Sequence, residues 1–524
     1  MSDEKTAVLV VGGGLAGLSA AAFLAWQDVP VLLVESHADL LIHPRSRGIT
    51  PRTSELLRQL GIEQQIIDAC GLDATQDKML SLRASTLSDP DFVTFGEGEA
   101  AKLAEHSPSQ WSAIDQDRLE VILRDRAREL GADIRFSTEL KEFEQGDNGV
   151  TAVIEDLATG KRSTISADYI VAADGNSSPI RERLGIPALG PGRFAEVASV
   201  MFEGDLSPVL AGRPVGVAYV EKPRPGTVLV RTAPQRWVAT FAQEETEYDE
   251  AAVVADLHAA IGEDLDVRVL PQVPGTDLKQ LWFVIGAQVA QEFRRGRVFL
   301  VGDAAHIVPP ALGQGGSMAI QDSNNLAWKL AAVHRGHAGD ALLDTYDAER
   351  KPVAFNTMGI VLAAGQARNS GQEPDDIDVG ALVFGYQYRS SAVLGAEGAP
   401  DAVPAEELTG QAGTRAPHLD VTIDGKPAST IDLYGPAFVL ITGEDGAAWA
   451  DAARTVSGDT GVRIDIADIG GRLGQVDKPI GAAHGITSTG ALLVRPDGFV
   501  AWRSPDAAGE PEQELRAVLN AVLA

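Results

Sequence analysis

Apolar runs near the start of the chain predict a strand, a helix and a second strand in close succession. Ala7 to Val11 are apolar and mostly β-branched, a glycine turn follows, and small and apolar residues then predict an amphipathic helix to about Leu24. A second apolar run ends in the acidic residue Glu35. We therefore predict a β-α-β unit of the kind that binds dinucleotides.

The hydrophobic rhythm changes twice further along the chain. From about residue 196 to 283 apolar residues recur with a period of two, which predicts antiparallel strands. These expected strands are Ala198–Phe202, Val215–Val220, Thr227–Val230 and Trp237–Gln243. Another buried strand is expected at Gly296–Val301, and the loop after it leads to a helix expected at Met318–Val333 with Ser317 as its N-cap.

Three glycines and one acid in the first unit indicate how a dinucleotide would be held. Gly12 permits the tight turn, Gly14 lets the backbone approach a pyrophosphate, and Gly17 lets helix and strand pack closely. The pyrophosphate would lie at the N-terminal end of the helix. Glu35 would accept hydrogen bonds from a ribose diol.

Two other interpretations of the first apolar segment are rejected. The uncharged stretch from Thr6 to Trp26 is long enough for a membrane span, and Lys5 before it loosely imitates a signal peptide. However, three consecutive glycines weaken a membrane helix, and Glu35 ends the next apolar run where a nucleotide-binding fold requires an acid. We expect no membrane association.

Composition narrows the class of protein. The 524 residues suggest two or three domains, and a hydrophobic content of 44% is typical of a globular protein. The formal charge of −30 opposes binding to nucleic acid or anionic membranes. The single cysteine, Cys70, permits no internal disulfide and no cysteine-based metal site, which fits the cytoplasm. We expect no bound metal.

Three ordered motifs make the chain resemble the FAD-dependent aromatic hydroxylases, the single-component flavoprotein monooxygenases of the para-hydroxybenzoate hydroxylase type. Gly12–Gly17 is similar to their FAD fingerprint, Asp174-Gly175 to their DG motif and Gly302-Asp303 to their GD motif. The resemblance covers about residues 7 to 353. Phe384–Ser391, together with the tail from residue 413, is similar to the branch that hydroxylates aromatic polyketides.

The resemblance implies an α/β fold in three parts. Residues 1–190 and 284–400 would form a discontinuous, Rossmann-like FAD-binding domain, and residues 191–283 an inserted, mainly antiparallel substrate-binding β-sheet domain. Residues 405–524 would form a thioredoxin-like domain, but they contain no cysteine, so thiol–disulfide chemistry is excluded there. A docking or assembly role is expected, and deletion after about Pro404 should lower stability or change the oligomeric state while leaving the flavin site assembled.

The resemblance also assigns cofactor contacts. Glu35 would hold the adenosine ribose, Arg45 and Gln116 would lie near the pyrophosphate and ribityl chain, and the backbone of Leu140 would touch adenine. Asp303 would bind a ribityl hydroxyl. The full set of expected FAD-binding residues is Gly12, Gly14, Leu15, Ala16, Gly17, Glu35, Arg45, Gln116, Leu140, Asp174, Asp303, Pro310, Gly315, Gly316, Ser317 and Met318.

Two residues depart from the family pattern. Ser36 stands where many relatives carry a basic residue against adenine, and Ser317 stands where many carry Asn beside the flavin ring. Backbone N–H groups at the helix N-terminus remain available to the ring whatever the side chain.

The implied chemistry belongs to the cofactor. NAD(P)H would reduce the flavin, which would then use O2 to hydroxylate an electron-rich phenol or quinone-derived ring. The protein would stabilise negative charge on the flavin and exclude water. No catalytic base is assigned: Tyr219, Tyr386, Tyr388 and Arg389 are pocket candidates, for each of which packing is the simpler interpretation, and His306 is interpreted as structural.

Three other functions stay open. A related flavoenzyme would catalyse Baeyer-Villiger insertion or oxidative rearrangement of the same substrates. An NAD-dependent dehydrogenase would leave Asp174-Gly175 and Gly302-Asp303 without a purpose, and the last alternative is a nucleotide-binding protein that is not an enzyme. The expected partners are an aromatic small molecule and O2, and the protein is expected to be a monomer or homodimer.

Overall fold

The central layer of the protein is an eight-stranded sheet in which the predicted β-α-β unit supplies two neighbouring strands. The computed structural model describes residues 3–40, 47–70, 80–95, 99–244, 247–272, 276–370, 377–476 and 478–524. The strand order is β17-β18-β10-β1-β2-β7, and a β8–β9 hairpin continues from β10. Its strands are β1 (Asp3–Val11), β2 (Val31–Val34), β7 (Asp133–Arg135), β8 (Thr138–Gly146), β9 (Gly149–Asp156), β10 (Lys161–Ala172), β17 (Arg294–Arg295) and β18 (Val298–Leu300).

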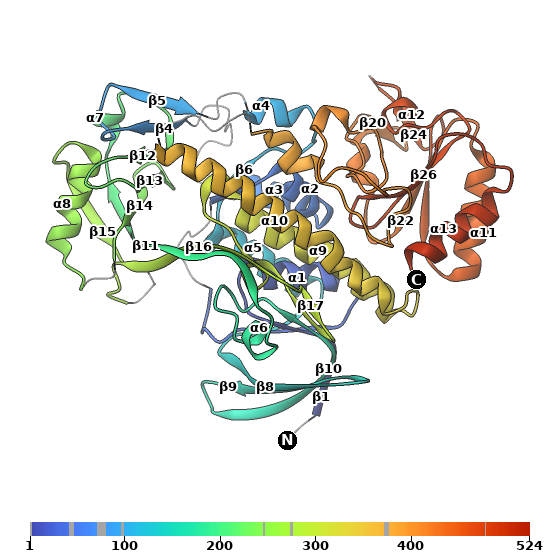
Figure 1. The fold of residues 1–524 in the computed structure, drawn as a ribbon, viewed down its shortest axis with the longest axis horizontal. Helices are drawn as coiled ribbons and strands as arrows, with labels where there is room; N and C mark the ends of the chain where they lie inside the picture. Colours follow the sequence, from blue (N-terminus) through green and yellow to red (C-terminus); the bar gives the residue numbers. More distant parts are fainter. Residues whose placement is uncertain are drawn as a thin grey trace.

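Helices cover this sheet and join it to the rest of the chain. The sheet is parallel from β18 to β7, because each of these strands returns through a crossover. The helices of this part are α1 (Leu15–Trp26), α2 (Pro51–Gln59), α3 (Glu63–Ala69), α5 (Gln116–Glu129), α6 (Pro179–Arg183), α9 (Gln314–His334) and α10 (Ala341–Ser370). Figure 1 shows α9 and α10 side by side through the centre of the molecule.

Helix α1 differs from the amphipathic helix that the sequence predicts. It packs against the sheet, α5 and α9, so its residues are buried on all sides from Gly17 to Ala25. A helix that is buried all round has no polar face, which explains why its sequence resembles a membrane span. Within the described residues, no helix has the length and apolar character to cross a membrane.

A nine-stranded second sheet forms the lobe on the left of Figure 1. Its strand order is β19-β16-β11-β14-β13-β12-β4-β5, with β15 also paired to β11. Helix α8 (Glu250–Ile261) covers one face, where Leu257 and Ile261 join the same hydrophobic cluster as strand residues. The strands are β4 (Leu80–Ala84), β5 (Phe92–Phe95), β11 (Ala188–Gly204), β12 (Val215–Val220), β13 (Thr227–Arg231), β14 (Arg236–Ala242), β15 (Val267–Leu270), β16 (Leu281–Ala290) and β19 (His306–Ile307).

Parts of this sheet lie outside the expected segment of residues 191–283: the strands β4, β5 and β19 and the end of β16. Strand β4 pairs in parallel with β12, and β5 pairs with β4, so residues 80–95 extend the second sheet from within the stretch expected to belong to the first domain. Smaller elements lie at this end: α4 (Glu99–Ala104), α7 (Ser207–Leu210) and a two-stranded ladder of β3 (Arg47–Ile49) with β6 (Ser112–Asp115). The chain therefore passes between the two lobes more often than the sequence predicts.

The C-terminal part contains a four-stranded sheet and a three-stranded sheet. The four-stranded order β23-β22-β25-β26 combines a parallel pair with an antiparallel hairpin, an arrangement compatible with a thioredoxin-like domain. Its elements are β20 (Asp420–Ile423), β21 (Lys426–Ser429), β22 (Phe438–Thr442), α11 (Ala447–Thr460), β23 (Ile464–Asp468), β24 (Leu473–Gln475), α12 (Ile480–Ala483), β25 (Ala491–Val494), β26 (Val500–Ser504) and α13 (Pro511–Val522). The predicted apolar face of α13 is confirmed: Leu515, Val518, Leu519 and Val522 are buried.

The turn between β25 and β26 carries buried charges into the main body of the molecule. Both guanidinium Nη atoms of Arg495 donate to the carboxylate of Glu349 on α10, at 2.6 and 2.8 Å. Lys329 on α9 donates to the same carboxylate at 2.7 Å. Burial alone would raise the pKa of Glu349, but these two cations hold it far below its ordinary value.

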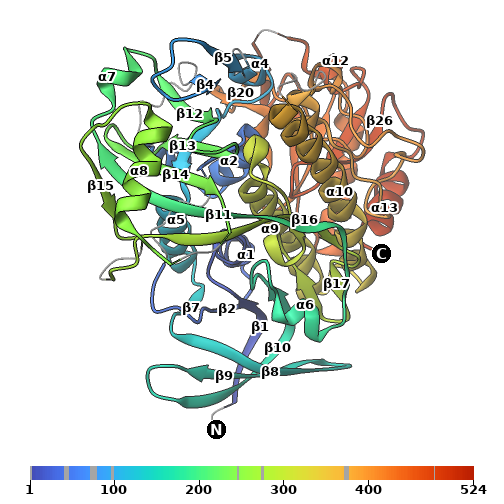
Figure 2. The same cartoon turned by 60° about the vertical axis from the view of Figure 1, so that its left-hand side comes forward.

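A second set of buried contacts joins α2 to the C-terminal domain. Arg52 donates to the backbone oxygen of Asp497 at 2.6 Å, and Arg415 Nε donates to Glu55 at 2.9 Å. All four side chains of these two pairs are almost completely enclosed. An ion pair in such surroundings is costly to separate, because each charge left alone would have to be desolvated without compensation. Charged groups buried at this junction thus bind the C-terminal domain to the rest of the chain. Figure 2 shows the C-terminal domain beside α10.

Candidate functional site

The predicted dinucleotide cradle is formed by backbone that approaches too closely for any side chain. Gly12 has φ of 109°, and a Cβ there would lie 2.2 Å from the carbonyl oxygen of Ala173. A Cβ at Gly17 would lie 1.9 Å from the oxygen of Gly12, so helix and strand meet here only because both residues are glycines. Gly14 is the N-cap of α1, and Leu15 and Ala16 begin the helix. The first turn of α1 therefore presents free backbone N–H groups, as an anionic diphosphate requires.

Glu35 lies directly beside this cradle. Its Oε2 accepts a hydrogen bond from Gly13 N at 2.6 Å, and its Oε1 accepts from the backbone N–H of His37 at 2.8 Å. Burial alone would raise the pKa of Glu35, but the hydrogen bonds from His37 and Gly13 outweigh it and lower the pKa. A carboxylate oxygen accepts two bonds, and among the described residues Oε2 accepts one, so it keeps an acceptor position for a ribose hydroxyl.

Gln116 and Leu140 lie on opposite flanks of the cradle. Gln116 begins α5 and donates to Glu120 at 2.7 Å, and Glu120 in turn comes within 3.8 Å of where a Gly14 Cβ would stand. Leu140 lies on β8, which starts where Thr138 N donates to the backbone oxygen of Glu35 at 2.8 Å. Both residues therefore lie on elements that border the cradle. Arg45 lies outside the described residues.

The GD motif packs against the same helix. Gly302 has φ of 56°, and a Cβ there would lie 2.8 Å from Cβ of Ala16. Asp303 follows in a short 3-10 helix after β18 and is exposed. Ala16 of the FAD fingerprint and Gly302 of the GD motif are 286 residues apart in the sequence and yet touch. This contact fits one extended cofactor that runs from α1 toward α9.

The N-terminus of α9 differs from the expectation. The helix begins at Gln314 with Gly313 as N-cap, so Gly315, Gly316, Ser317 and Met318 all lie in its first turns, and Pro310 lies in the turn before it. The prediction that Ser317 caps the helix is wrong. Its hydroxyl is completely buried and accepts from the backbone N–H of Thr50 at 3.0 Å, which ties α9 to the start of α2.

Sequence reasoning missed the residue that joins these parts, Asp322. Its Oδ2 accepts from Gly302 N at 3.1 Å and pairs with His306 Nε2 at 2.6 Å, while its Oδ1 accepts from Arg350 Nε at 2.7 Å. Burial would raise the pKa of Asp322, but His306 and Arg350 lower it. The interpretation of His306 as structural agrees with this pairing. The only sequence signal was an acid inside the helix expected at Met318–Val333.

The DG motif acts through its loop. The carboxylate of Asp174 accepts from Ser178 Oγ at 2.7 Å and from Ile180 N at 2.9 Å, so both oxygens hold the turn into α6. Burial raises the pKa of Asp174. Arg181 then donates to the backbone oxygen of Ala304 at 3.1 Å, linking the DG loop to the GD motif. Asp174 therefore shapes the site through the backbone, and Arg181 is a second residue that sequence reasoning missed.

The structure places the four candidate pocket residues in different environments. Tyr388 is buried, stacks on Phe499 with ring centroids 4.0 Å apart and accepts a hydrogen bond from Arg350 at 3.1 Å. Tyr386 donates to Gln321 at 3.2 Å and is also buried at the junction with the C-terminal domain. Arg389 is exposed and pairs with Asp401. These three have the packing or rim roles that were the simpler interpretation.

Tyr219 remains as a candidate that faces a site. Burial alternates along β12, and its neighbours Ala218 and Val220 belong to the cluster on the α8 face. Because successive strand residues point to opposite faces, half-buried Tyr219 lies on the face away from α8. In Figure 1 that face of the sheet is turned toward α9 and the centre of the molecule.

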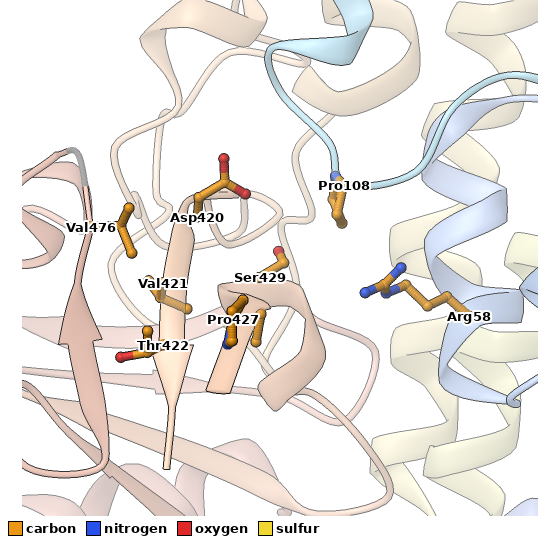
Figure 3. Close-up of a pocket in the computed structure, with 9 residues that line it drawn as sticks. Arg58, Pro108, Asp420, Val421, Thr422, Pro427, Ser429 and Val476 are labelled. Atoms are coloured by element: carbon orange, nitrogen blue, oxygen red, sulfur yellow. The ribbon is translucent and has the colours of Figure 1, made fainter. Parts of the chain in front are cut away.

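A pocket of about 490 Å³ lies elsewhere, between α2 and the three-stranded sheet of the C-terminal domain. Figure 3 shows Arg58 and Pro108 on one side and residues of β20 and β21 on the other. Arg58 is already paired with Asp432 and Glu63, at 2.7 and 2.6 Å. The described residues hold no group of acidic or histidine side chains that would bind a metal ion.

Comparisons with known proteins agree with this geometry. Residues 5–359 match the family described as FAD binding domain, and residues 409–524 match the aromatic-ring hydroxylase, C-terminal family. Tetracenomycin B2 monooxygenase-dioxygenase of Streptomyces olivaceus is 40% identical over 100% of both chains. Aklavinone-11 hydroxylase, solved with FAD and aklavinone, has a TM-score of 0.91 and 35% identity over 100% of both chains. The flavin-dependent monooxygenase PieE, solved with FAD and substrate, has a TM-score of 0.86 and 32% identity over 99% of both chains.

The agreement covers the whole chain, and it includes the three motifs that meet around α1 and the C-terminal domain that follows them. The glycine cradle, which any Cβ would fill, and the free acceptor position of Glu35 fit FAD. This chain belongs to the FAD-dependent aromatic-ring hydroxylases, a family of flavoprotein monooxygenases.

Proposed function

We propose that this protein uses FAD, NAD(P)H and O2 to hydroxylate a polycyclic aromatic phenol or quinone of the polyketide type. The observation that supports it most directly is the contact of Gly302 with Ala16, because it brings the FAD fingerprint, the GD motif and α9 to one place. The relatives that the chain resembles over its full length include hydroxylases of such compounds.

The expected FAD-binding residues follow as part of this proposal. Gly12, Gly14, Leu15, Ala16 and Gly17 hold the diphosphate, with Glu35 at the ribose. Flanking contacts come from Arg45, Gln116, Leu140, Asp174 through its loop, Asp303 and Pro310, and from Gly315, Gly316, Ser317 and Met318 along α9. We place the FAD-binding domain at about residues 1–190 and 284–400, with residues 80–95 added to the substrate-binding sheet of residues 191–283, and the C-terminal domain at 405–524.

When bound, the flavin supplies the redox chemistry, taking a hydride from the nicotinamide and using O2 to oxygenate the ring. The protein chain positions the flavin and supplies an electrostatic field around it. The first turn of α9 offers unpaired backbone N–H groups and the positive end of a 21-residue helix, which stabilise negative charge placed there. Asp322, about two turns further along α9, fixes the helix relative to Gly302, and the Thr50–Ser317 hydrogen bond fixes its start relative to α2.

The substrate is proposed to lie between this helix end and the open face of the second sheet. Half-buried Tyr219 and its neighbours Val217 and Val228 give that face an apolar floor with one hydroxyl. An aromatic ring system packs well on such a surface, and a single polar group orients it. Water is excluded from the reacting ring when this space is filled.

Product analysis tests the proposal. The purified protein should be yellow with bound FAD, and under 18O2 it should introduce one labelled oxygen into a polycyclic phenol while consuming one NAD(P)H. A protein that carries no flavin, or that oxidises NAD(P)H without ever labelling an aromatic product, contradicts it. Light scattering of the eluted protein decides between the proposed monomer and homodimer. We place the enzyme in the cytoplasm, because one cysteine in 524 residues suits a reducing compartment.

A second outcome has a specific observation in its favour. The relative from Streptomyces olivaceus is named a monooxygenase-dioxygenase. The number of labelled atoms in each product separates simple hydroxylation, with one, from an overall reaction that introduces more than one, and product structure identifies Baeyer-Villiger insertion or rearrangement.

A further inference from the structure

The indole of Trp111 lies between two backbone segments beside the start of α9. Trp111 directly precedes β6, and its side chain is half-buried. A Cβ added at Gly48 on β3 would lie 2.8 Å from its Nε1, and a Cβ added at Gly313, the N-cap of α9, would lie 3.8 Å from its Cζ2. One edge of the indole therefore runs from β3 to the point where α9 begins.

The backbone at this point is strained. In the short 3-10 turn Ala311–Gly313, Leu312 has φ of 65°, in the left-handed region that side chains disfavour. The other non-glycine residues with positive φ in the described part of the chain are aspartate, serine and alanine, so Leu312 is unusual for its size. Strain of this kind persists only where the surrounding structure fixes it.

Contacts from outside the turn hold it in this conformation. The buried side chain of Gln314 donates from Nε2 to the backbone oxygen of Leu312 at 2.9 Å. Strand β3 packs against the turn, and the indole of Trp111 lies against Gly313. The first backbone N–H groups of α9 follow directly after this turn, so their direction depends on these contacts.

The opposite side of Trp111 is backed by a buried apolar cluster. Its members come from α4 and from the segment before the C-terminal domain: Leu103, Val383, Phe384, Ala405 and Leu408. Phe384 lies in a π-helix, Ala381–Gly385, a rare geometry that is frequent at functional sites. The guanidinium of Arg415 lies 4.7 Å from the centre of the Phe384 ring and is itself paired with buried Glu55. The indole is thus wedged between a fixed cluster and a strained turn.

We propose that Trp111 is a positioning residue for the flavin: by holding the turn of Leu312 and Gly313, it aims the first N–H groups of α9 at the flavin ring. This inference rests on the proposed function, which places negative charge of the reduced flavin at this helix end. The effect of a helix N-terminus falls off within one turn, so a small relaxation of the Leu312 turn weakens it. Reduced flavin carries the added charge, and it would lose more binding energy than oxidised flavin.

The experiment measures the midpoint potential of protein-bound FAD, by photoreduction beside a dye of known potential. It requires neither a nicotinamide nor an aromatic substrate. Trp111→Ala should raise the dissociation constant of reduced FAD about tenfold more than that of oxidised FAD, the effect of misplacing one hydrogen bond to a charged group. For a two-electron couple this lowers the midpoint potential by about 30 mV. Trp111→Phe keeps an apolar ring in the wedge and should recover most of the shift.

Trp26→Ala is the matched control. Trp26 is also half-buried, and its Cζ2 lies 4.0 Å from where a Cβ of Gly435 would stand, so a similar contact is removed. It ends α1 beside Gln27, which accepts a hydrogen bond from Arg335 at the far end of α9. The 21 residues of α9 place this site roughly 30 Å along the helix from its start. Trp26→Ala should change the melting temperature and leave the midpoint potential as in wild type.

Several results would overturn the proposal. They are an unchanged potential in Trp111→Ala, an equal shift in Trp26→Ala, and a shift in Trp111→Phe as large as that in Trp111→Ala. If Trp111→Ala fails to fold or to retain FAD, Trp111→Leu serves instead, because it leaves a smaller apolar side chain in the wedge. An intermediate shift in Trp111→Leu supports the proposal, and a wild-type potential contradicts it.

A separate measurement keeps the proposed function distinct. Labelled product from the wild-type protein under 18O2 tests hydroxylation and involves no variant. If that product forms while the Trp111 variants keep the wild-type potential, this inference fails and the proposed function stands. If the Trp111 variants shift the potential while the wild type labels no aromatic product, the proposed function fails and the positioning role stands.

Discussion

Glu35 has two roles: it stabilises the backbone around it, and it offers an acceptor to the ligand. Its carboxylate holds Gly13 and His37 by their backbone N–H groups, and one acceptor position on Oε2 remains for a ribose. Glu35→Ala should weaken FAD binding roughly 10- to 100-fold, corresponding to the roughly 1.5–3 kcal/mol of a hydrogen bond to a charged group. Recovery of flavin fluorescence on dilution measures this. Glu139→Ala, at a surface acid on β8, is the control, and equal FAD affinity in both variants would remove Glu35 from the ribose.

His484 predicts a dependence of stability on pH. It is completely buried, its Nδ1 lies 2.9 Å from the backbone oxygen of Ile480, and burial lowers its pKa to about 4 from 6.5. Because the folded pKa is depressed, the unfolded chain binds the proton more tightly, so stability present above pH 6.5 is lost as the pH falls toward 4. The loss attributable to this residue is about 3 kcal/mol.

Urea unfolding at pH 7 and pH 4.5 checks this for wild type and His484→Leu. The free-energy advantage of wild type over the variant should shrink by about 2–3 kcal/mol at the lower pH. Parallel pH profiles of the two proteins would show that His484 does not change its protonation on unfolding.

At the scale of elements, the start of α9 depends on Asp322. Asp322→Asn removes a buried charge and leaves Arg350 without its carboxylate, which typically costs about 3–5 kcal/mol. We expect a lower melting temperature and weaker FAD binding together, because Asp322 also holds Gly302. Asp344→Asn on α10 removes an equal charge from a pair whose acid is 74% exposed, and it should cost less than about 1 kcal/mol. An Asp322→Asn variant as stable as Asp344→Asn would contradict this role.

Local patterns sufficed for some elements and failed for others. The β-α-β unit was predictable because strand, turn and helix are consecutive, and α13 because its apolar residues repeat along one face. The start of α9 was misplaced because glycines disfavour helices, whereas burial and the Thr50–Ser317 bond stabilise the helix there. The pairing of strand β4 with the second sheet was not predictable, because its partner β12 lies more than a hundred residues away.

The candidate site shows the same limit. Glycine positions and Glu35 were predictable because one local fold requires them. Asp322, Arg350 and Arg181 were not, since their partners are set by how α9, α10 and the DG loop pack together. A pairing between residues 28 positions apart leaves no periodic trace in the sequence.

At the scale of the whole molecule, the structure changes the expectation for the C-terminal domain. Removing residues 405–524 would take Arg495 from Glu349 and Arg415 from Glu55, and both acids are fully enclosed. Each uncompensated buried charge typically costs about 3–5 kcal/mol, comparable to much of the stability of a domain. We therefore expect the truncated chain to lack both a stable fold and bound FAD. This differs from the expectation drawn from the sequence, in which the flavin site stays assembled after the deletion.

Far-ultraviolet circular dichroism and flavin content of the truncated chain test this. Arg454→Gln in the full chain, at an exposed pair on α11, is a control for loss of a cation from the same domain and should be unchanged. A soluble truncated protein with wild-type flavin affinity would show that the buried pairs are dispensable.

The Arg495–Asp497 turn has a consequence for how such genes diversify. Its Arg495 donates to Glu349, which also accepts from Lys329, and Arg52 from α2 donates to the backbone of Asp497. The matching residues therefore lie in three distant stretches of the coding sequence. A crossover between two related genes near the codon for Pro404 joins a hairpin from one parent to an acid and a lysine from the other. A recombinant protein would fold only when both parents carry the same charged residues at these positions. These residues should therefore be inherited together, while surface residues around them change independently.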